Sequence, residues 1–115
     1  MAYIPKQGDI IKMCFNPTLG HEQQGNHRPA LIISNNSYNI FARGTAIVCP
    51  ITNTDRGLVT HVKLDNRTKT TGVIMCEQIK ALDLTKRNAI FEEQIPQDIL
   101  SEVCDMISGF TEIED

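Results

Sequence analysis

Short runs of apolar residues, separated by Gly, Pro, Asn and other polar residues, mark the first three quarters of this chain. Runs of this length with such boundaries are typical of β-strands. The pattern predicts six strand segments, at residues 9–15, 28–34, 45–52, 59–64, 72–78 and 79–84. The first two segments flank a polar loop, Asn16 to His27, and we expect them to pair across it.

The segment TAIVCPIT, residues 45–52, is apolar at consecutive positions. Because side chains alternate between the two faces of a strand, both of its faces should be buried. One face would carry Ala46, Val48 and Pro50, and the other Ile47, Cys49 and Ile51. Before this segment, Ser34 followed by NNSYNIF predicts a short helical turn capped by Ser34 and ended by Arg43-Gly44.

Apolar residues recur at helical spacing in the last quarter of the chain, which predicts one amphipathic helix. They are Ile99, Leu100, Val103, Met106, Ile107 and Phe110. Pro96 suits the first helical position, and Asp98 is favourable near the positive end of the helix dipole. Gly109 lies close to the expected end, and we expect residues 110–115 to form a frayed acidic tail.

A strand-rich region followed by one helix predicts a β-rich α+β fold, either a curled antiparallel sheet or a small barrel closed by the helix. The gaps between strands are too short for crossover helices, which argues against a parallel α/β fold. At 115 residues, we expect a single domain over residues 1–115.

The net charge of −3 conceals an uneven distribution. All 11 Lys and Arg residues lie in residues 1–87 with six acidic residues, whereas residues 88–115 hold the other eight acids. A basic body of this kind indicates binding to a polyanion such as nucleic acid. A solvated acidic helix and tail would explain the same distribution equally well.

The four cysteines are widely spaced and form no C-x-x-C pair, so we expect neither a metal site nor any other cofactor. No apolar run approaches the roughly 20 residues that cross a bilayer. The start MAYIPKQGD lacks the apolar core of a secretory signal. These features predict a cytoplasmic protein without a membrane partner.

Six stretches of the chain together resemble the MazF/PemK family of toxin ribonucleases. They are GDI (8–10), NPTLGHEQQG (16–25), RPALIIS (28–34), CPIT (49–52), GVIMCEQIK (72–80) and PQDILSEV (96–103). The resemblance implies an SH3-like small barrel of five to seven strands with a C-terminal helix, and a homodimer. It also implies the toxin of a type II toxin-antitoxin system that cleaves single-stranded mRNA without metal and is neutralised by a cognate antitoxin.

The resemblance assigns catalytic roles to Arg28 of RPA and Thr52 of CPIT, and Kid-like members of the family also use residues that match His21 and Glu77. Met75 departs from the pattern, because Kid-like members have an arginine there. Any role of that arginine as a general acid must be taken here by another group, most simply Arg28, or this protein does not use an arginine in that role. Substrate contacts are expected from Glu22, Gln23, Asn26, His27 and Gln78.

RNA cleavage by 2′-hydroxyl attack needs a base at the hydroxyl and donors to the phosphate as charge builds. Arg28 suits the phosphate, because its planar fork can hold two oxygens at once, and Thr52 offers a hydroxyl to the same group. Glu77 interrupts an apolar segment where burial would raise its pKa, whereas His21 titrates near neutrality without help. The sequence leaves the choice of base open.

Each assignment has a structural alternative. Arg28 could brace the loop through Glu22, Thr52 could be present for its β propensity, and Glu77 could be an edge-strand charge that discourages aggregation. At the level of function, the alternative is a toxin of the same fold that binds DNA gyrase, as CcdB-like proteins do. That family ends in a tryptophan-containing tail, whereas this chain has no tryptophan.

Overall fold

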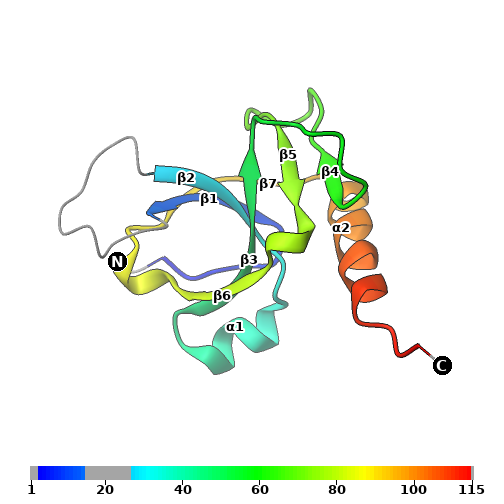
Figure 1. The fold of residues 1–115 in the computed structure, drawn as a ribbon. Coiled ribbons are helices and arrows are strands. Elements are labelled where there is room, and N and C mark those ends of the chain that lie inside the picture. Colours follow the sequence, from blue (N-terminus) through cyan, green and yellow to red (C-terminus); the bar gives the residue numbers. More distant parts are fainter. Residues whose placement is uncertain (1–2, 15–26, 115) are drawn as a thin grey trace.

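The computed structural model describes residues 3–14 and 27–114 as a curled β-sheet with two helices (Figure 1). In chain order the elements are β1 (Asp9–Cys14), β2 (His27–Ile32), α1 (Asn36–Ala42), β3 (Thr45–Thr52), β4 (His61–Lys63), β5 (Val73–Met75), β6 (Lys80–Asp83), β7 (Ile90–Gln94) and α2 (Gln97–Phe110). Short 3₁₀ turns occupy Cys76–Gln78 and Leu84–Lys86.

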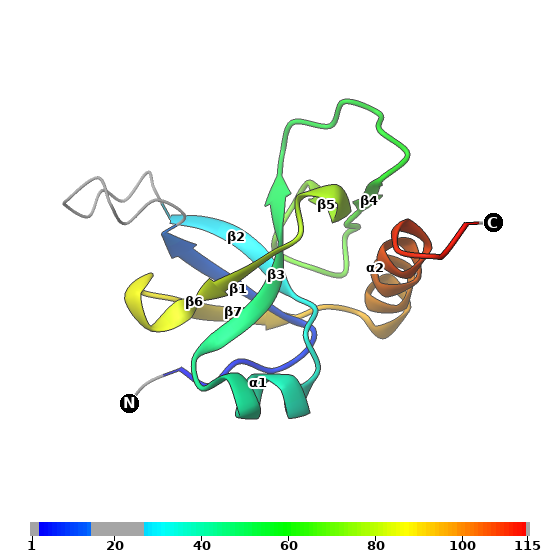
Figure 2. The same cartoon turned by 60° about the horizontal axis from the view of Figure 1, so that its bottom comes forward.

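The seven strands form one sheet in the order β4-β5-β3-β2-β1-β7, and β6 also pairs with β3. All of these pairings are antiparallel. β3 pairs with β6 over its first half and with β5 at its end, so the sheet divides around it, as Figure 2 shows. The predicted curled antiparallel sheet with a C-terminal helix is confirmed, as is the pairing of the first two strands.

β3 separates two apolar clusters, as the alternation of its side chains predicts. Ala46 and Val48 belong to one cluster, with residues of β1, β2 and the Leu84–Lys86 turn. Cys49 and Ile51 belong to the other, which lies against α2. On α2, the buried residues are Ile99, Leu100 and Val103. Full burial of one such side chain contributes roughly 1.5–3 kcal/mol, so the helix is held mainly by this face.

Two helix boundaries differ from the predictions. Asn35 caps α1 in place of Ser34, because its side chain accepts a hydrogen bond from the Tyr38 N–H. Ser34 is buried and instead accepts a hydrogen bond from the Ile47 N–H at 3.0 Å. Pro96 is the N-cap of α2 and not its first residue. The predicted end of α1 is confirmed, since Arg43 adopts a left-handed conformation there.

The 72–78 segment is a strand only as far as Met75 and then turns into the 3₁₀ turn. The sequence pattern also missed β7. This strand lies at the edge of the sheet beside β1, and both Ile90 and Phe91 are largely exposed. Its sequence therefore lacks the alternation of apolar and polar residues that marks a strand with one buried face. No helix within residues 3–14 and 27–114 is long and apolar enough to cross a membrane.

The polar loop at residues 65–72 is tied to both β7 and α2. The Glu93 carboxylate accepts hydrogen bonds from the Lys69 and Thr70 amides, at 3.1 and 2.8 Å, and from the Thr70 hydroxyl at 2.9 Å. Arg67 bridges Asp65 and Asp98 at the start of α2. Partial burial raises the pKa of the Glu93 carboxyl, but the donors from Thr70 and Lys69 outweigh burial and hold the pKa below its ordinary value.

We predict that Glu93→Gln destabilises the protein by about 1 kcal/mol at pH 7, since hydrogen bonds to a charged acceptor are lost. A depressed native pKa stabilises the fold above the unfolded-state pKa, and this contribution disappears as the pH falls through the native pKa. The difference should therefore narrow below about pH 4. Urea unfolding of the wild type and the variant, at pH 7 and below about pH 4, measures this difference in stability.

Glu92→Gln is the matched control, because the contact of the Glu92 carboxylate within the described residues is a surface ion pair with the Lys12 ammonium, at 3.9 Å. Such exposed pairs contribute little to stability. An equal deficit of Glu93→Gln at both pH values would show that the ionised carboxylate is not what holds the loop.

Candidate active site

The strand register brings Arg28 and Thr52 to the same end and the same face of the β2–β3 pair. Ala30 pairs with Pro50 in these antiparallel strands. Arg28 lies two residues before Ala30 and Thr52 two residues after Pro50, so both lie at the same end of the pair. Because side chains alternate, both lie on the face that carries Ala30 and Pro50. The Arg28 residue is exposed and Thr52 is half-buried, so both are accessible to a substrate.

The same face continues across β5 and β4. Thr52 pairs with Val73, so the next β5 residue on this face is Met75. Met75 in turn pairs with His61 of β4. The face that carries Arg28 and Thr52 therefore reaches an imidazole that lies directly across from the position of Met75.

Glu77 joins this face from the 3₁₀ turn after β5. Its Oε1 accepts a hydrogen bond from the Thr60 hydroxyl at 2.8 Å, and its Oε2 lies 3.2 Å from His61 Nε2. The Glu77 side chain is 31% exposed, whereas that of His61 is only 4% exposed. One polar group holds each carboxylate oxygen, and the carboxylate keeps an open side to solvent.

The expectation of a raised Glu77 pKa is wrong. Burial alone would raise it, but the hydrogen bonds from Thr60 and His61 outweigh burial and lower the pKa. The reason is that Glu77 lies in an exposed turn, where its carboxylate finds two donors, and not inside an apolar strand. It is therefore ionised at neutral pH and able to accept a proton.

Sequence reasoning missed Thr60 and His61. Thr60 directly precedes β4 and His61 is its first residue, and their contact with Glu77 depends on the β4–β5 register. The only signal was the alternation of the THVK stretch, which placed a polar pair at the start of a strand but not opposite a partner.

Four of the candidate residues, His21, Glu22, Gln23 and Asn26, lie outside the described residues. His27 and Gln78 are described, and Gln78 is exposed in the same 3₁₀ turn as Glu77. His27 lies on the opposite face of β2 from Arg28, because the two are adjacent in the strand.

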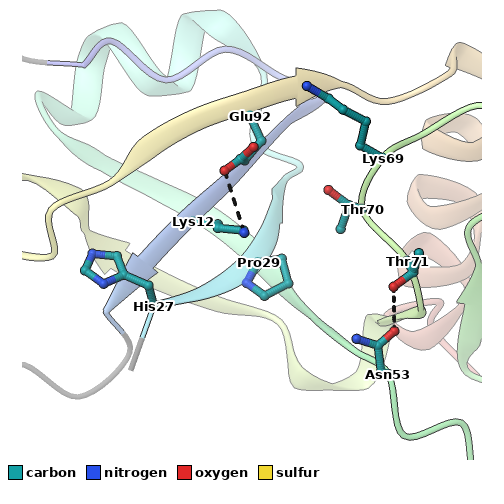
Figure 3. Close-up of a pocket in the computed structure, with 8 residues that line it drawn as sticks. All are labelled: Lys12, His27, Pro29, Asn53, Lys69, Thr70, Thr71 and Glu92. Atoms are coloured by element: carbon teal, nitrogen blue, oxygen red, sulfur yellow. Dashed lines mark hydrogen bonds and ion pairs between the residues drawn. The ribbon is translucent and has the colours of Figure 1, made fainter. Parts of the chain in front are cut away.

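His27 lines a polar pocket of about 280 Å³ on that opposite face. Figure 3 shows His27, Lys12 and Pro29 on one side of the pocket and the 69–71 segment on the other. The pocket is lined by Lys12, His27, Pro29, Asn53, Lys69, Thr70, Thr71 and Glu92. Arg28, Thr52 and Glu77 are not among its lining residues, so the sheet separates it from the face that carries them.

Within residues 3–14 and 27–114, no group of three or more His, Cys, Asp or Glu side chains is placed to hold a metal ion. The four cysteines are free thiols, and three of them are buried. Burial raises the pKa of Cys49 to about 12 and that of Cys76 to about 11, so these thiols stay protonated and unreactive at neutral pH.

Residues 6–110 match the family of PemK-like, MazF-like toxins of type II toxin-antitoxin systems. The chain belongs to this family. Membership confirms the resemblance inferred from the six sequence stretches.

Among curated relatives, the chain is 36% identical to endoribonuclease PemK of Escherichia coli over 107 residues, which cover 90% of this chain and 79% of that protein. It is 38% identical to endoribonuclease toxin ChpB of Escherichia coli K12, over 73% of this chain and 74% of the relative. Among solved structures, MazF of Deinococcus radiodurans aligns with a TM-score of 0.80 and 32% identity, over 95% of this chain and 97% of that one.

In this member of the family, Gly72 sets how closely β5 approaches the end of β3. Its φ is +113°, and an added Cβ would lie 2.2 Å from the Thr52 carbonyl oxygen. The Thr52 side chain also accepts a hydrogen bond from the Thr54 amide at 3.1 Å. The position of Thr52 thus depends on a neighbour that lacks a side chain.

We predict that Gly72→Ala displaces the end of β3 and destabilises the protein by about 1–3 kcal/mol, the range for a strained backbone. Amide NMR shifts should change at Thr52 and Thr54, and thermal unfolding should occur at a lower temperature. Gly57→Ala is the control, because Gly57 also has a positive φ but no atom near its Cβ position. If both variants behaved alike, steric overlap with Thr52 would not be the cause.

Proposed function

We propose that this protein is the toxin of a type II toxin-antitoxin system and acts as a sequence-specific endoribonuclease on single-stranded mRNA. The observation that carries the proposal is the family match over residues 6–110, joined to relatives named endoribonucleases in two bacterial species. The accessible face with Arg28, Thr52 and an ionised Glu77 supplies groups suited to that chemistry.

In the proposed mechanism, Glu77 is the general base. Its ionised carboxylate accepts the proton of the ribose 2′-hydroxyl as that oxygen attacks the adjacent phosphorus, and the bond to the 5′-oxygen breaks. Glu77 is assigned as the base because its carboxylate is held in place by two neighbours and is accessible on the face that carries Arg28 and Thr52. His21 would then supply the proton to the leaving 5′-oxygen, because its ordinary pKa lies close to neutrality.

Arg28 stabilises the charge that develops on the phosphoryl oxygens. Its guanidinium has no ready proton to give, since its pKa exceeds about 12, but it can donate two parallel hydrogen bonds. Thr52 adds a hydroxyl donor to the same oxygens. With these groups the step needs no metal ion, and Met75 takes no part in proton transfer.

Substrate contacts are proposed for Glu22, Gln23, Asn26, His27 and Gln78. For His27, this requires the RNA to extend past the first residue of β2 to the opposite face of the sheet. A homodimer that acts in the cytoplasm completes the proposal. The homodimer rests on the family resemblance, and the cytoplasmic location rests on the sequence features described above.

A cognate antitoxin is the proposed protein partner. Solved relatives include MazE–MazF complexes of Deinococcus radiodurans, one of which aligns with a TM-score of 0.82 and 26% identity, over 98% of this chain and 100% of that chain. An acidic and apolar antitoxin segment would suit the basic body of this chain and could occupy the surface that RNA needs. The alternative, a gyrase-binding toxin, is not favoured, because the relatives are named endoribonucleases and this chain lacks tryptophan.

We predict that Arg28→Ala lowers cleavage of a long unstructured RNA by on the order of 100-fold or more, as loss of a donor to a developing oxyanion does. Arg28→Lys should also be impaired, because an ammonium cannot reproduce the two-pronged contact. The assay is run in excess EDTA with the cut sites mapped, and the wild type should cut at a recurring short motif.

Lys86→Ala is the control, because it removes one positive charge from an exposed position in the Leu84–Lys86 turn. Its cleavage rate should stay within about twofold of the wild type. Near-normal cleavage by Arg28→Ala would remove Arg28 from the mechanism. RNA left intact by the wild type in EDTA would contradict metal-independent cleavage.

A further inference from the structure

His61 is a buried polar side chain with one satisfied and one unsatisfied ring nitrogen. Nε2 lies 3.2 Å from the Glu77 carboxylate, and the side chain is only 4% exposed. Within the described residues, the buried Nδ1 has no hydrogen-bond partner. An unpaired buried polar atom is costly, so packing alone does not account for a histidine at this position.

The contact with Glu77 assigns the tautomer of the ring. An ionised carboxylate can only accept hydrogen bonds, so Nε2 must carry the proton and donate it. In the neutral imidazole, Nδ1 is then an acceptor that faces the protein interior. His61 therefore has one productive contact, the hydrogen bond to Oε2 of Glu77.

Within the part of the chain that the structure describes, β4 and β5 bring no unpaired charge to this contact. Met75, which pairs with His61 on β5, is uncharged, and the Lys63 ammonium further along β4 meets Asp55 at 3.8 Å. In the apolar cluster on the other elements, the titratable groups are the thiols of Cys49, Cys76 and Cys104. The helix α2, which packs against β4, also carries the exposed carboxylates of Asp98, Glu102 and Asp105, and Asp98 is paired with Arg67. The thiols are neutral, because burial raises the pKa of each.

We propose that His61 is a positioning residue for the base Glu77. Its Nε2–H holds Oε2 while the Thr60 hydroxyl holds Oε1, so the carboxylate is fixed in orientation and kept ionised, with its open side toward the substrate. This inference rests on the proposed function, because it assigns Glu77 the role of base. It adds a requirement for two residues of the β4 segment that the site motifs do not contain.

The arrangement has a consequence for the pH dependence of cleavage. Donors to a carboxylate favour its charged form, so loss of the His61 donor raises the pKa of Glu77. The base is then protonated over a wider acidic range, and the acidic limb of kcat/KM moves to higher pH. Loss of orientation lowers kcat as well, with little change in KM, because His61 does not touch the substrate.

His61→Leu and His61→Gln test the proposal in the full-length protein. His61→Leu should lower kcat by about tenfold or more, the loss expected for a hydrogen bond to a charged group, and should shift the acidic limb upward. His61→Gln can place an amide N–H near the position of Nε2 and should restore part of both effects. Thr111→Val, on the exposed segment after α2, is the control for folding and assay conditions.

A second measurement follows the carboxylate itself and needs no activity. The ¹³C NMR titration of the Glu77 carboxyl, assigned by its absence in Glu77→Gln, should show a higher pKa in His61→Leu than in the wild type. Where His61→Leu does not fold, His61→Asn serves, because its shorter amide does not reach Glu77.

The outcomes distinguish a failure of the role proposed for His61 from a failure of the proposed ribonuclease function. An unchanged Glu77 titration in a folded His61 variant overturns the inference, as does a shifted titration with unchanged kcat and an unchanged acidic limb. If the wild-type protein does not cleave RNA, the proposed function fails, and a shifted titration would then leave only a structural contact between His61 and Glu77.

Discussion

β3 is buried on both faces and pairs on both edges, and the positions of Arg28, Thr52 and Glu77 follow from it. Its alternating side chains pack into two separate clusters. A shift of the strand by one residue would move every side chain to the opposite cluster, so its register is fixed. That fixed register determines which side chains of β2 and β5 lie on the same face as Thr52. The site is therefore a product of the sheet and not of any one loop.

β3 exchanges one partner for another along one of its edges. β6 pairs with residues 45–48 and β5 with residues 51–52, so the change of partner lies between them and β5 holds the end of the strand at Thr52. Gly72 permits the close approach of β5, and the Glu93 carboxylate holds the loop that precedes it. Rigid neighbours thus fix an accessible threonine, which is the arrangement a site for an extended substrate requires.

Much of this fold could be predicted from the sequence, because buried strands and helices show a pattern of apolar residues. The two faces of residues 45–52 and the apolar stripe of α2 were readable for that reason. β7 was not, since an exposed edge strand has no periodic pattern. Arg28 and Thr52 came from motif resemblance, whereas the partners of Glu77 depend on a cross-strand register. The expected pKa of Glu77 was wrong for the same reason. The local sequence shows an apolar segment, but it shows neither the turn that holds Glu77 nor the donors from the neighbouring strand.

The central claim is that cleavage proceeds by attack of the ribose 2′-hydroxyl, with Glu77 as base and Arg28 on the phosphate. Mass spectrometry of the products from a short synthetic RNA that carries one cut site tests it most directly. Internal attack leaves the phosphate on the upstream fragment, so we predict a 2′,3′-cyclic phosphate there and a free 5′-hydroxyl downstream. A 3′-hydroxyl paired with a 5′-phosphate would mean that water attacks the phosphorus, and it would contradict the account.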